Sequence, residues 1–372
     1  MGLADFFAID HSATRKTTVE AAVNVLPEAY SQMYYPSGFT YATRAQAMSI
    51  PAFARARNII CGTIGSLPIE AYNKTTRAEI YGNPLLTQPD PSMPRSVTLA
   101  WLVEDLLLTG LGYMQILETD PQSGRPIHAR RIEPQRVSFN TESATNDTIT
   151  EFYVDGSPVP FTGVGSIILF TSFDEGVLSR AGQTIKTAYN LENAASNMAV
   201  EPVPTGILKN TGVDLPAEQV SGILAAWKQA RQNRSTAYLN SALDFKEIGF
   251  DPASMQLVEA RKFTTEIIAH LVGLPSYYLN ADSNSNTYAN TVDQRINLVD
   301  FSLKPLIACI EQRLSMDDIT PVTQIVRFDL DDYLRGKPLE QIEVIERMMA
   351  LNLIDEQEAR AMMDLAPRGM EA

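Results

Sequence analysis

The 372-residue sequence has few of the side chains that enzymes use most often for catalysis. It contains three histidines and two cysteines. No nucleophile elbow, phosphate-binding loop, His-Glu-x-x-His pair or Cys-x-x-Cys pair occurs in it. His11, His128 and His270 lie far apart along the chain and form no recognisable motif. The sequence therefore predicts a protein that is not an enzyme and that carries no cofactor.

Positive charge is also scarce. The 30 Lys and Arg residues face 44 Asp and Glu residues, which leaves a net charge of -14. Proteins that bind DNA regardless of sequence gain affinity from basic side chains that neutralise phosphates. We therefore do not expect this chain to hold nucleic acid over its whole surface, although like charge would let DNA slide without sticking. Half of the net charge, 13 acidic against 6 basic residues, lies in residues 317–372, where a solvated surface is the simplest interpretation.

Long apolar runs are absent as well. No stretch of eighteen apolar residues exists, so no membrane span is expected. The first ten residues lack the basic start and apolar run of a signal peptide, and Phe6 replaces the hydroxyl residue of a myristoylation motif. Cys61 and Cys309 lie in apolar helical contexts, which favours free thiols in a reducing compartment. A single disulfide remains the alternative.

Alternating short helices and strands predict an α+β lobe over residues 45–177, after a polar and aromatic segment, residues 1–44, that resembles an extended arm. A helix is predicted over Ser49–Gly65, with Ser49 as its cap, and a second over Ser96–Thr109. Strands are predicted at Leu67–Tyr72, Tyr113–Glu118, Arg131–Phe139, Glu151–Val154 and Ser166–Phe170. The length of the chain favours two or three such lobes.

Two helices enclose a small insertion in the second half. Leu178–Glu201 has apolar residues at helical spacing, and a helix starting at Asp251-Pro252 runs to Leu271. Between them, residues 205–249 are nearly balanced in charge. Three basic residues lie at the end of a predicted helix in this insertion, namely Lys228, Arg231 and Arg234. They either complement the helix dipole or bind a partner.

Residues 280–290 are small and polar and cannot form a packed element. They include Asp282, Ser283, Asn284, Ser285, Asn286, Thr287, Tyr288 and Asn290. An amphipathic helix is predicted directly afterwards over Val292–Leu314, with a kink at Pro305. A plain surface linker is the simplest interpretation of the loop from its composition.

Asp329 lies near the end of a predicted strand, Ile325–Leu330, and with Asp331 it would place two carboxylates on one face of a strand. Such a pair could begin a Mg²⁺ site, so a metal-dependent enzyme is one alternative function. No third ligand has an evident spacing from the pair, and carboxylates in a strand-to-helix turn are the better explanation of it. The chain closes with a predicted helix pair, Pro338–Ala350 and Asp355–Leu365, whose Asp355 and Glu358 resemble a capping box.

The order of these elements resembles the portal protein family of long-tailed double-stranded-DNA bacteriophages, from about Ser49 to Pro367. The segments that carry the resemblance are Ala56–Tyr72 (ARNIICGTIGSLPIEAY), Asn83–Pro91 (NPLLTQPDP), Leu106–Tyr113 (LLLTGLGY), Gln256–Leu279 (QLVEARKFTTEIIAHLVGLPSYYL), Phe328–Arg335 and Leu353–Pro367 (LIDEQEARAMMDLAP). Asp90 stands where the family usually has Asn. Each segment alone is weak, but the six occur in the family's order.

The resemblance implies the following subdivision. Residues 1–44 would be an N-terminal arm, and residues 45–177 would form the first part of the wing. Residues 178–204 and 251–275 would be two stem helices, with the clip between them at residues 205–250. Residues 276–337 would complete the wing, with a tunnel loop at 280–290 and a long helix at 292–314, and residues 338–372 would form a short crown. A tunnel loop of Asn, Ser and Thr fits such a role, because it offers replaceable hydrogen bonds and no fixed positive charge.

The resemblance also implies partners. The chain would form a homo-oligomeric ring, a dodecamer, at one capsid vertex of the virion, assembled in the host cytoplasm. Double-stranded DNA would pass through it without sequence-specific contacts. The terminase large subunit, a head-tail connector or adaptor, and the major capsid protein or scaffold would dock on it. Another virion ring, such as a head-tail adaptor, is a further alternative, although adaptors are usually shorter.

Overall fold

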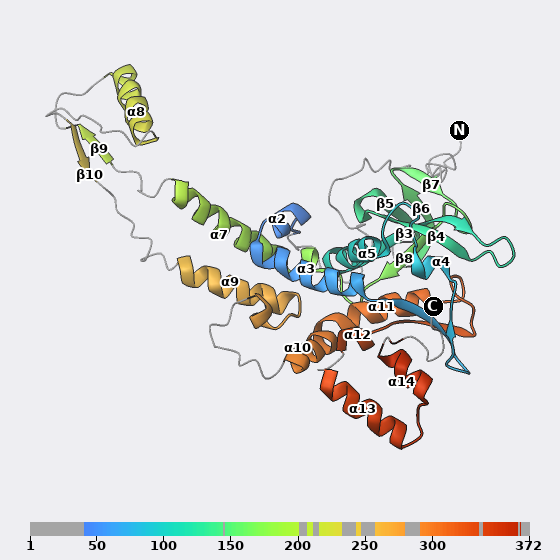
Figure 1. Cartoon of the computed structure of the whole chain (residues 1–372). Coiled ribbons are helices and arrows are strands. Elements are labelled where there is room, and N and C mark those ends of the chain that lie inside the picture. The colour runs from blue at the N-terminus through green and yellow to red at the C-terminus, as the bar shows by residue number, and fades with distance from the viewer. Residues whose placement is uncertain are drawn as a thin grey trace, which may run out of the picture.

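The computed structural model describes residues 41–143, 146–200, 207–210, 216–232, 243–246, 257–279, 291–334, 338–363 and 365. The fold mixes helices and sheets. A compact body carries most of the strands, and two helices project from it toward a small separate unit (Figure 1). A pair of short helices at the end of the chain lies on another side of the body.

Two helices form the centre of the body. They are α3 (Pro51–Ser66) and α5 (Arg95–Thr109), and their apolar residues are fully or almost fully buried where the two helices pack together. A Cβ added at Gly65 would lie 2.7 Å from the backbone oxygen of Ser96, so the close approach of the helices requires glycine there. Gly110 ends α5 with a φ of 74°, as predicted for its position.

The strands of the body form three antiparallel sheets. In the first, β3 (Leu111–Thr119) lies between β4 (Pro126–Ile132) and β8 (Ile167–Thr171). The second contains β5 (Val137–Ser143), β6 (Asn146–Val154) and β7 (Ser157–Val159). The third joins distant parts of the chain, because β1 (Ile69–Asn73) pairs with β2 (Glu79–Ile80) and with β11 (Gln324–Phe328).

The body has two apolar cores. The larger one surrounds α3 and α5, and the smaller one lies around the strands β3 to β8. The smaller core contains Leu111, Tyr113, Ile132, Val137, Phe139 and Phe152. Phe139 and Phe152 meet edge to face at 6.1 Å between ring centroids, a favoured aromatic geometry.

The projecting helices are α7 (Gly182–Val200) and α9 (Leu257–Leu271), which lie side by side (Figure 1). The short helix α6 (Val177–Arg180) precedes α7. The small unit beyond them contains α8 (Ala217–Gln232) and a two-stranded antiparallel sheet of β9 (Ile207–Asn210) and β10 (Leu243–Lys246). The described residues of the predicted insertion thus lie beyond the two projecting helices (Figure 1).

The predicted long helix consists of three consecutive segments. They are α10 (Thr291–Leu298), the π-helical turn η5 (Val299–Leu303) and α11 (Lys304–Leu314). The 3-10 turn η3 (Ser276–Leu279) lies before the loop region. After β11 the chain forms α12 (Asp331–Leu334), α13 (Pro338–Ala350) and α14 (Glu356–Met362). The remaining short elements are α2 (Arg44–Met48), α4 (Pro84–Thr87) and η2 (Pro134–Arg136).

Four local predictions were wrong. Ser49 ends α2 rather than capping α3, and its hydroxyl donates to the Gln46 carbonyl. The predicted strand over residues 131–139 is two strands, because Pro134 starts a 3-10 turn between them. The predicted helix over residues 178–201 is interrupted at Ala181. The irregularity in the long helix is the π-helical turn before Pro305, which itself lies in the first turn of α11.

Candidate functional site

Polar contacts join the two projecting helices to each other and to the short helix α6. Arg180 donates from its guanidinium to the Leu271 carbonyl at 2.7 Å, which ties α6 to the end of α9. Along the helices, Arg261 of α9 makes a two-pronged ion pair with Glu192 of α7 at 2.9 and 3.1 Å. These contacts hold the two helices as one projecting arm.

The two ends of the predicted tunnel loop are joined directly. The loop residues themselves, 280–290, lie outside the described residues. On one side of the loop, the Tyr278 hydroxyl donates to the Gln294 carbonyl on the other side at 3.1 Å. Leu279 is buried at the end of η3. The loop therefore starts and finishes close together, at the inner end of α9.

Aromatic side chains reinforce this junction. The rings of Tyr277 and Tyr278 lie in contact, tilted by 33°, with 4.7 Å between their centroids. Arg295 of α10 lies over the ring of Tyr333 in α12, with 6.0 Å from its guanidinium carbon to the ring centroid. Burial raises the pKa of the Tyr333 hydroxyl, which stays neutral at physiological pH. The junction thus links the end of α9, the long helix and the segment that leads to the C-terminal helices.

The predicted basic cluster is only partly described. Lys228 and Arg231 belong to α8 in the small unit, whereas Arg234 lies outside the described residues. Exposed apolar side chains, Val220 and Leu224, lie on the same helix. The end of α8 therefore remains a predicted partner-binding surface.

The predicted carboxylate pair does not lie on one face of a strand. β11 ends at Phe328, and Asp331 is already the first residue of α12. The Asp329 carboxylate accepts a hydrogen bond from the Asp331 backbone nitrogen at 2.8 Å, which is the role of a turn residue before a helix. Within the described residues, no group of three His, Cys, Asp or Glu side chains could hold a metal ion. The expectation of two carboxylates on one strand face was therefore wrong, and the turn interpretation is confirmed.

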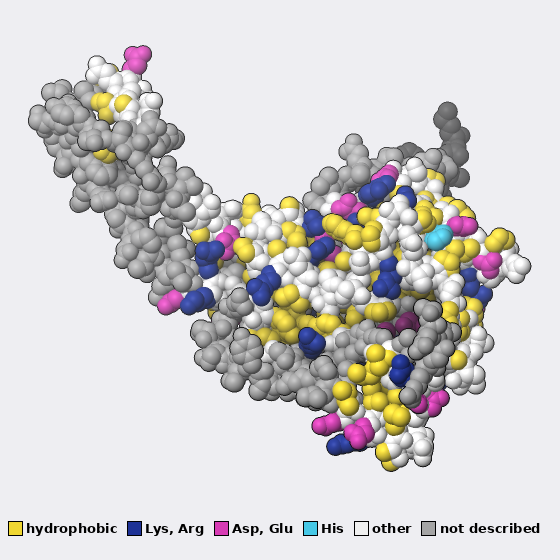
Figure 2. Space-filling model, in the orientation of Figure 1, with side chains coloured by type: hydrophobic (Ala, Val, Ile, Leu, Met, Phe, Trp, Pro, Cys, Tyr) yellow, Lys and Arg dark blue, Asp and Glu magenta, His cyan; other side chains and the backbone are white. Residues whose placement is uncertain are grey.

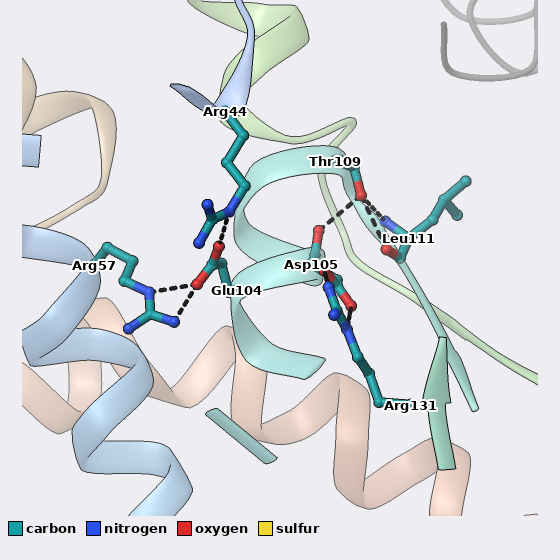
Figure 3. A network of polar contacts seen from close by, with 7 residues as sticks. All are labelled: Arg44, Arg57, Glu104, Asp105, Thr109, Leu111 and Arg131. Carbon is teal, nitrogen blue, oxygen red and sulfur yellow. Dashed lines mark hydrogen bonds and ion pairs between the residues drawn. The ribbon is translucent and has the colours of Figure 1, made fainter. Parts of the chain in front are cut away.

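The sequence did not reveal a buried ionic network in the body (Figure 3). Glu104 of α5 is 1% exposed and pairs with two arginines, Arg44 at 2.5 Å and Arg57. Next to it, Asp105 accepts both arms of the Arg131 guanidinium at 2.6 and 2.7 Å. The network therefore connects α2, α3, α5 and β4.

An aromatic ring lies among the cations of this network. The guanidinium carbons of Arg44, Arg57 and Arg131 are 5.2, 5.3 and 5.1 Å from the ring centroid of Trp101. Cations over an indole face gain electrostatic attraction. Every carboxylate in the network is paired, so it holds elements together rather than offering a reactive group. The sequence places Glu-Asp inside an apolar helix, and this is the signal from which the network could have been suspected.

Burial determines the protonation of groups near this network. It raises the pKa of Asp105 to about 7, even though Arg131 opposes the shift. It also raises the pKa of the Cys61 thiol to about 12, which makes that thiol unreactive. Cys61 and Cys309 are both free, so the disulfide alternative does not hold, although Cys309 is only half-buried.

The family follows from a comparison with known proteins. The family model described as "Phage portal protein" matches residues 51–364, which include the body, the projecting helices and the C-terminal helices. The chain belongs to the phage portal protein family. This family is structural rather than enzymatic. Among the described residues, no helix is both long and apolar enough to cross a bilayer.

Similar proteins agree with this assignment. A probable portal protein of Streptomyces phage phiC31 is 23% identical over 358 residues, covering 87% of this chain and 76% of that protein. A crystal structure of an HK97-family phage portal protein from Corynebacterium diphtheriae has a TM-score of 0.64 and 24% identity, over 81% of this chain and 99% of that chain. A chain in the neck of a native gene transfer agent particle, computed with C12 symmetry, has a TM-score of 0.53 and 21% identity, over 91% and 98% of the two chains.

Proposed function

We propose that this portal protein forms a twelve-membered ring at one vertex of a virion, through which double-stranded DNA enters and leaves the capsid. The projecting pair α7 and α9, which ends in a separate small unit, is the observation that supports this most. A pair of helices that projects from each subunit can line a channel in a ring. The twelve-fold symmetry of the gene transfer agent neck supports the copy number.

In this proposal each part of the chain has a place in the ring. The body is the wing, α7 and α9 are the stem, the unit of α8, β9 and β10 is the clip, and α13 with α14 is the crown. The clip docks the terminase large subunit during packaging and a head-tail connector later, and Lys228, Arg231 and Arg234 contribute to that surface. The wing faces the major capsid protein or the scaffold. Assembly takes place in the host cytoplasm.

The loop at 280–290 faces the DNA. Its side chains are almost all small and uncharged, and the tie between Tyr278 and Gln294 keeps its two ends together at the root of the stem. Each fixed cation in such a loop would add a phosphate contact and therefore resist sliding. We infer that the loop forms a weak, replaceable contact with the DNA backbone.

The test is to place cations in the loop. Asn284→Lys with Asn286→Lys should leave ring assembly intact, as seen by electron microscopy, and reduce the amount of DNA packaged. Asn284→Gln with Asn286→Gln is the matched control, because it keeps the amide and adds similar bulk. Normal genome filling with the lysine pair in place would contradict a loop that meets DNA.

A further inference from the structure

The outward side of the long helix is largely apolar. The inward side chains of η5 and α11 are buried in the larger core. The outward ones, spaced like one side of a helix, are Phe301, Pro305, Ala308, Cys309 and Gln312. Phe301 is 74% exposed, and the next three are partly exposed. A helix side that faces water is normally polar, so an apolar one indicates that another segment covers it.

A second exposed aromatic ring adjoins this side of the helix. The Phe173 backbone nitrogen donates a hydrogen bond to the Cys309 thiol, and the Phe173 ring is 70% exposed. The loop that carries Phe173 cannot move inward, because its backbone already touches the end of α5. A Cβ added at Gly176 in this loop would lie 2.5 Å from the Leu108 carbonyl oxygen. We define Phe173, Phe301, Pro305, Ala308 and Cys309 as the apolar face.

The N-terminal part of the chain joins the body close to the apolar face. Ala42 is buried, and its backbone nitrogen donates to the Leu178 carbonyl at 3.1 Å. Leu178 follows Phe173 by only five residues, so the chain before Ala42 starts within about 20 Å of Phe173. From Phe301 to Cys309 the helix rises by about 12 Å. A dozen extended residues span up to about 40 Å, which is more than enough to cover the face.

The composition of residues 29–40 suits an apolar surface. These residues lie outside the described part of the chain. None of the twelve is charged, and four are aromatic, against 8% aromatic residues in the whole chain. The four are Tyr30, Tyr34, Tyr35 and Phe39. Each aromatic ring that leaves water for an apolar contact removes a large area from solvent. Covering the apolar face therefore stabilises both the segment and the helix.

Nucleic acid fits this surface poorly. A polyanion gains its affinity from basic side chains, and the apolar face contains none. Figure 2 shows basic side chains of the body dispersed among hydrophobic and other polar ones, with no large basic patch among the described side chains of the face drawn. The aromatic segment of the chain itself is both close enough and chemically suited.

We propose that residues 29–40 fold back over the apolar face of their own chain as a strap, with their aromatic rings against Phe173, Phe301 and Pro305. The strap shields the outward side of the long helix from other proteins. It also ties the N-terminal part of the chain to the helix that follows residues 280–290. Because the strap and the apolar face belong to one chain, the inference goes beyond the proposed ring and does not depend on it.

The first experiment uses the native Cys309 thiol as a reporter. Ser37→Cys keeps every aromatic ring of the strap. In the full chain it should form a bis-maleimide bridge to Cys309, because Cys61 is buried and unreactive. A bridge within one chain leaves the mass of a monomer on a denaturing gel, and peptide mass spectrometry identifies the two linked residues.

Matched phenylalanine variants separate docking from mere nearness along the chain. Phe301→Ser, added to Ser37→Cys, should lower the yield of the bridge by about tenfold, because the strap loses an apolar contact. Phe161→Ser is the control, since Phe161 is also exposed but lies in the loop after β7. Equal yields with the two serine variants would overturn the proposal. Covalent dimers in place of bridged monomers would also overturn it, because the strap would then cover a second copy.

The second experiment follows amide hydrogen exchange in residues 29–40 of the full chain. Docking should slow exchange there in the wild type. Phe173→Ser combined with Phe301→Ser should speed it by about tenfold or more. Phe161→Ser with Val164→Ser, which changes another pair of exposed apolar residues, should leave the exchange rates unchanged. Wild-type exchange as fast as in an unstructured peptide would show that no strap forms, whether or not the chain assembles into rings.

Discussion

The body of this portal protein buries its apolar side chains, whereas the C-terminal hairpin, formed by α13, α14 and the turn between them, leaves most of its large apolar side chains exposed. The body completes two cores within one chain and even pairs its buried charges, as the contacts of Glu104 and Asp105 illustrate. The hairpin buries Ala359 and leaves most of its large apolar residues exposed. The body therefore completes its packing within one chain, whereas the hairpin leaves large apolar side chains in contact with solvent. Substitutions in the two regions should differ accordingly.

The largest effect is expected at the buried ionic network. Arg131→Met removes the cation that pairs with the buried Asp105 carboxylate. Loss of one partner of a buried pair costs about 3–5 kcal/mol, because the Asp105 carboxyl must then either stay charged in a medium that solvates it poorly or take up a proton. Thermal or urea unfolding of the isolated subunit measures the loss. Arg136→Met is the control, since its pair with Asp155 is exposed at the surface, and equal losses at the two sites would contradict the account.

A smaller effect is expected where α3 and α5 touch. Gly65→Ala places a methyl group 2.7 Å from the Ser96 carbonyl oxygen, so the helices must separate. We expect a loss of about 1–3 kcal/mol in the free energy of unfolding. Gly62→Ala in the same helix is the control, because its added methyl meets nothing within 4 Å. That variant should be more stable than the wild type by up to about 1 kcal/mol, and a loss there would count against this packing.

Asp105 should make stability depend on pH. Its pKa of about 7 in the folded chain lies above the value of about 3.9 in the unfolded chain. The folded chain therefore holds the proton more tightly, so this contribution to stability is complete below about pH 4 and is lost as the pH rises through about 7. Asp105→Asn stays neutral and should show a flatter profile of unfolding midpoint against pH. Superimposable profiles of the two proteins would show that the carboxylate remains ionised.

The smallest effect on the isolated subunit is expected in the hairpin. Leu353→Ser changes a side chain that is already mostly in water, so the free energy of unfolding of the monomer should move by less than about 0.5 kcal/mol. Differential scanning calorimetry of the dilute subunit is the measurement. A loss comparable to that of Gly65→Ala would mean that the hairpin is part of the body's core.

The sequence predicted elements well wherever periodicity and a stop residue coincide. Helix α5 is confirmed, and its apolar run ends at Gly110. The predicted capping box is also confirmed, because the Glu358 carboxylate accepts from the Asp355 backbone nitrogen at 2.9 Å and the Asp355 carboxylate accepts from the Glu358 backbone nitrogen at 2.7 Å. Local sequence patterns could not predict contacts between residues that lie far apart along the chain. The pairing of β1 with β11 is one such case, and the partners of Glu104 come from residues 47 and 60 positions away.

Some features of the candidate site could also be predicted from the sequence, whereas others depend on contacts between distant residues. The composition of residues 280–290 predicted a loop without basic side chains. The hydrogen bond from the Tyr278 hydroxyl to the Gln294 carbonyl, which joins the two ends of this loop, could not be predicted, because no sequence pattern indicates which carbonyl a tyrosine hydroxyl will contact. The carboxylates at Asp329 and Asp331 looked like ligands in sequence. The structure shows that β11 ends at Phe328, so these carboxylates belong to a turn and do not share one face of a strand.

The central claim, a ring of this chain around a DNA channel, is tested most directly by imaging the purified protein by electron microscopy. The account predicts closed rings with an open centre and the stem helices α7 and α9 around it, with twelve copies when assembly occurs in the particle. Single subunits under all conditions, including in the presence of capsid and terminase proteins, would contradict it.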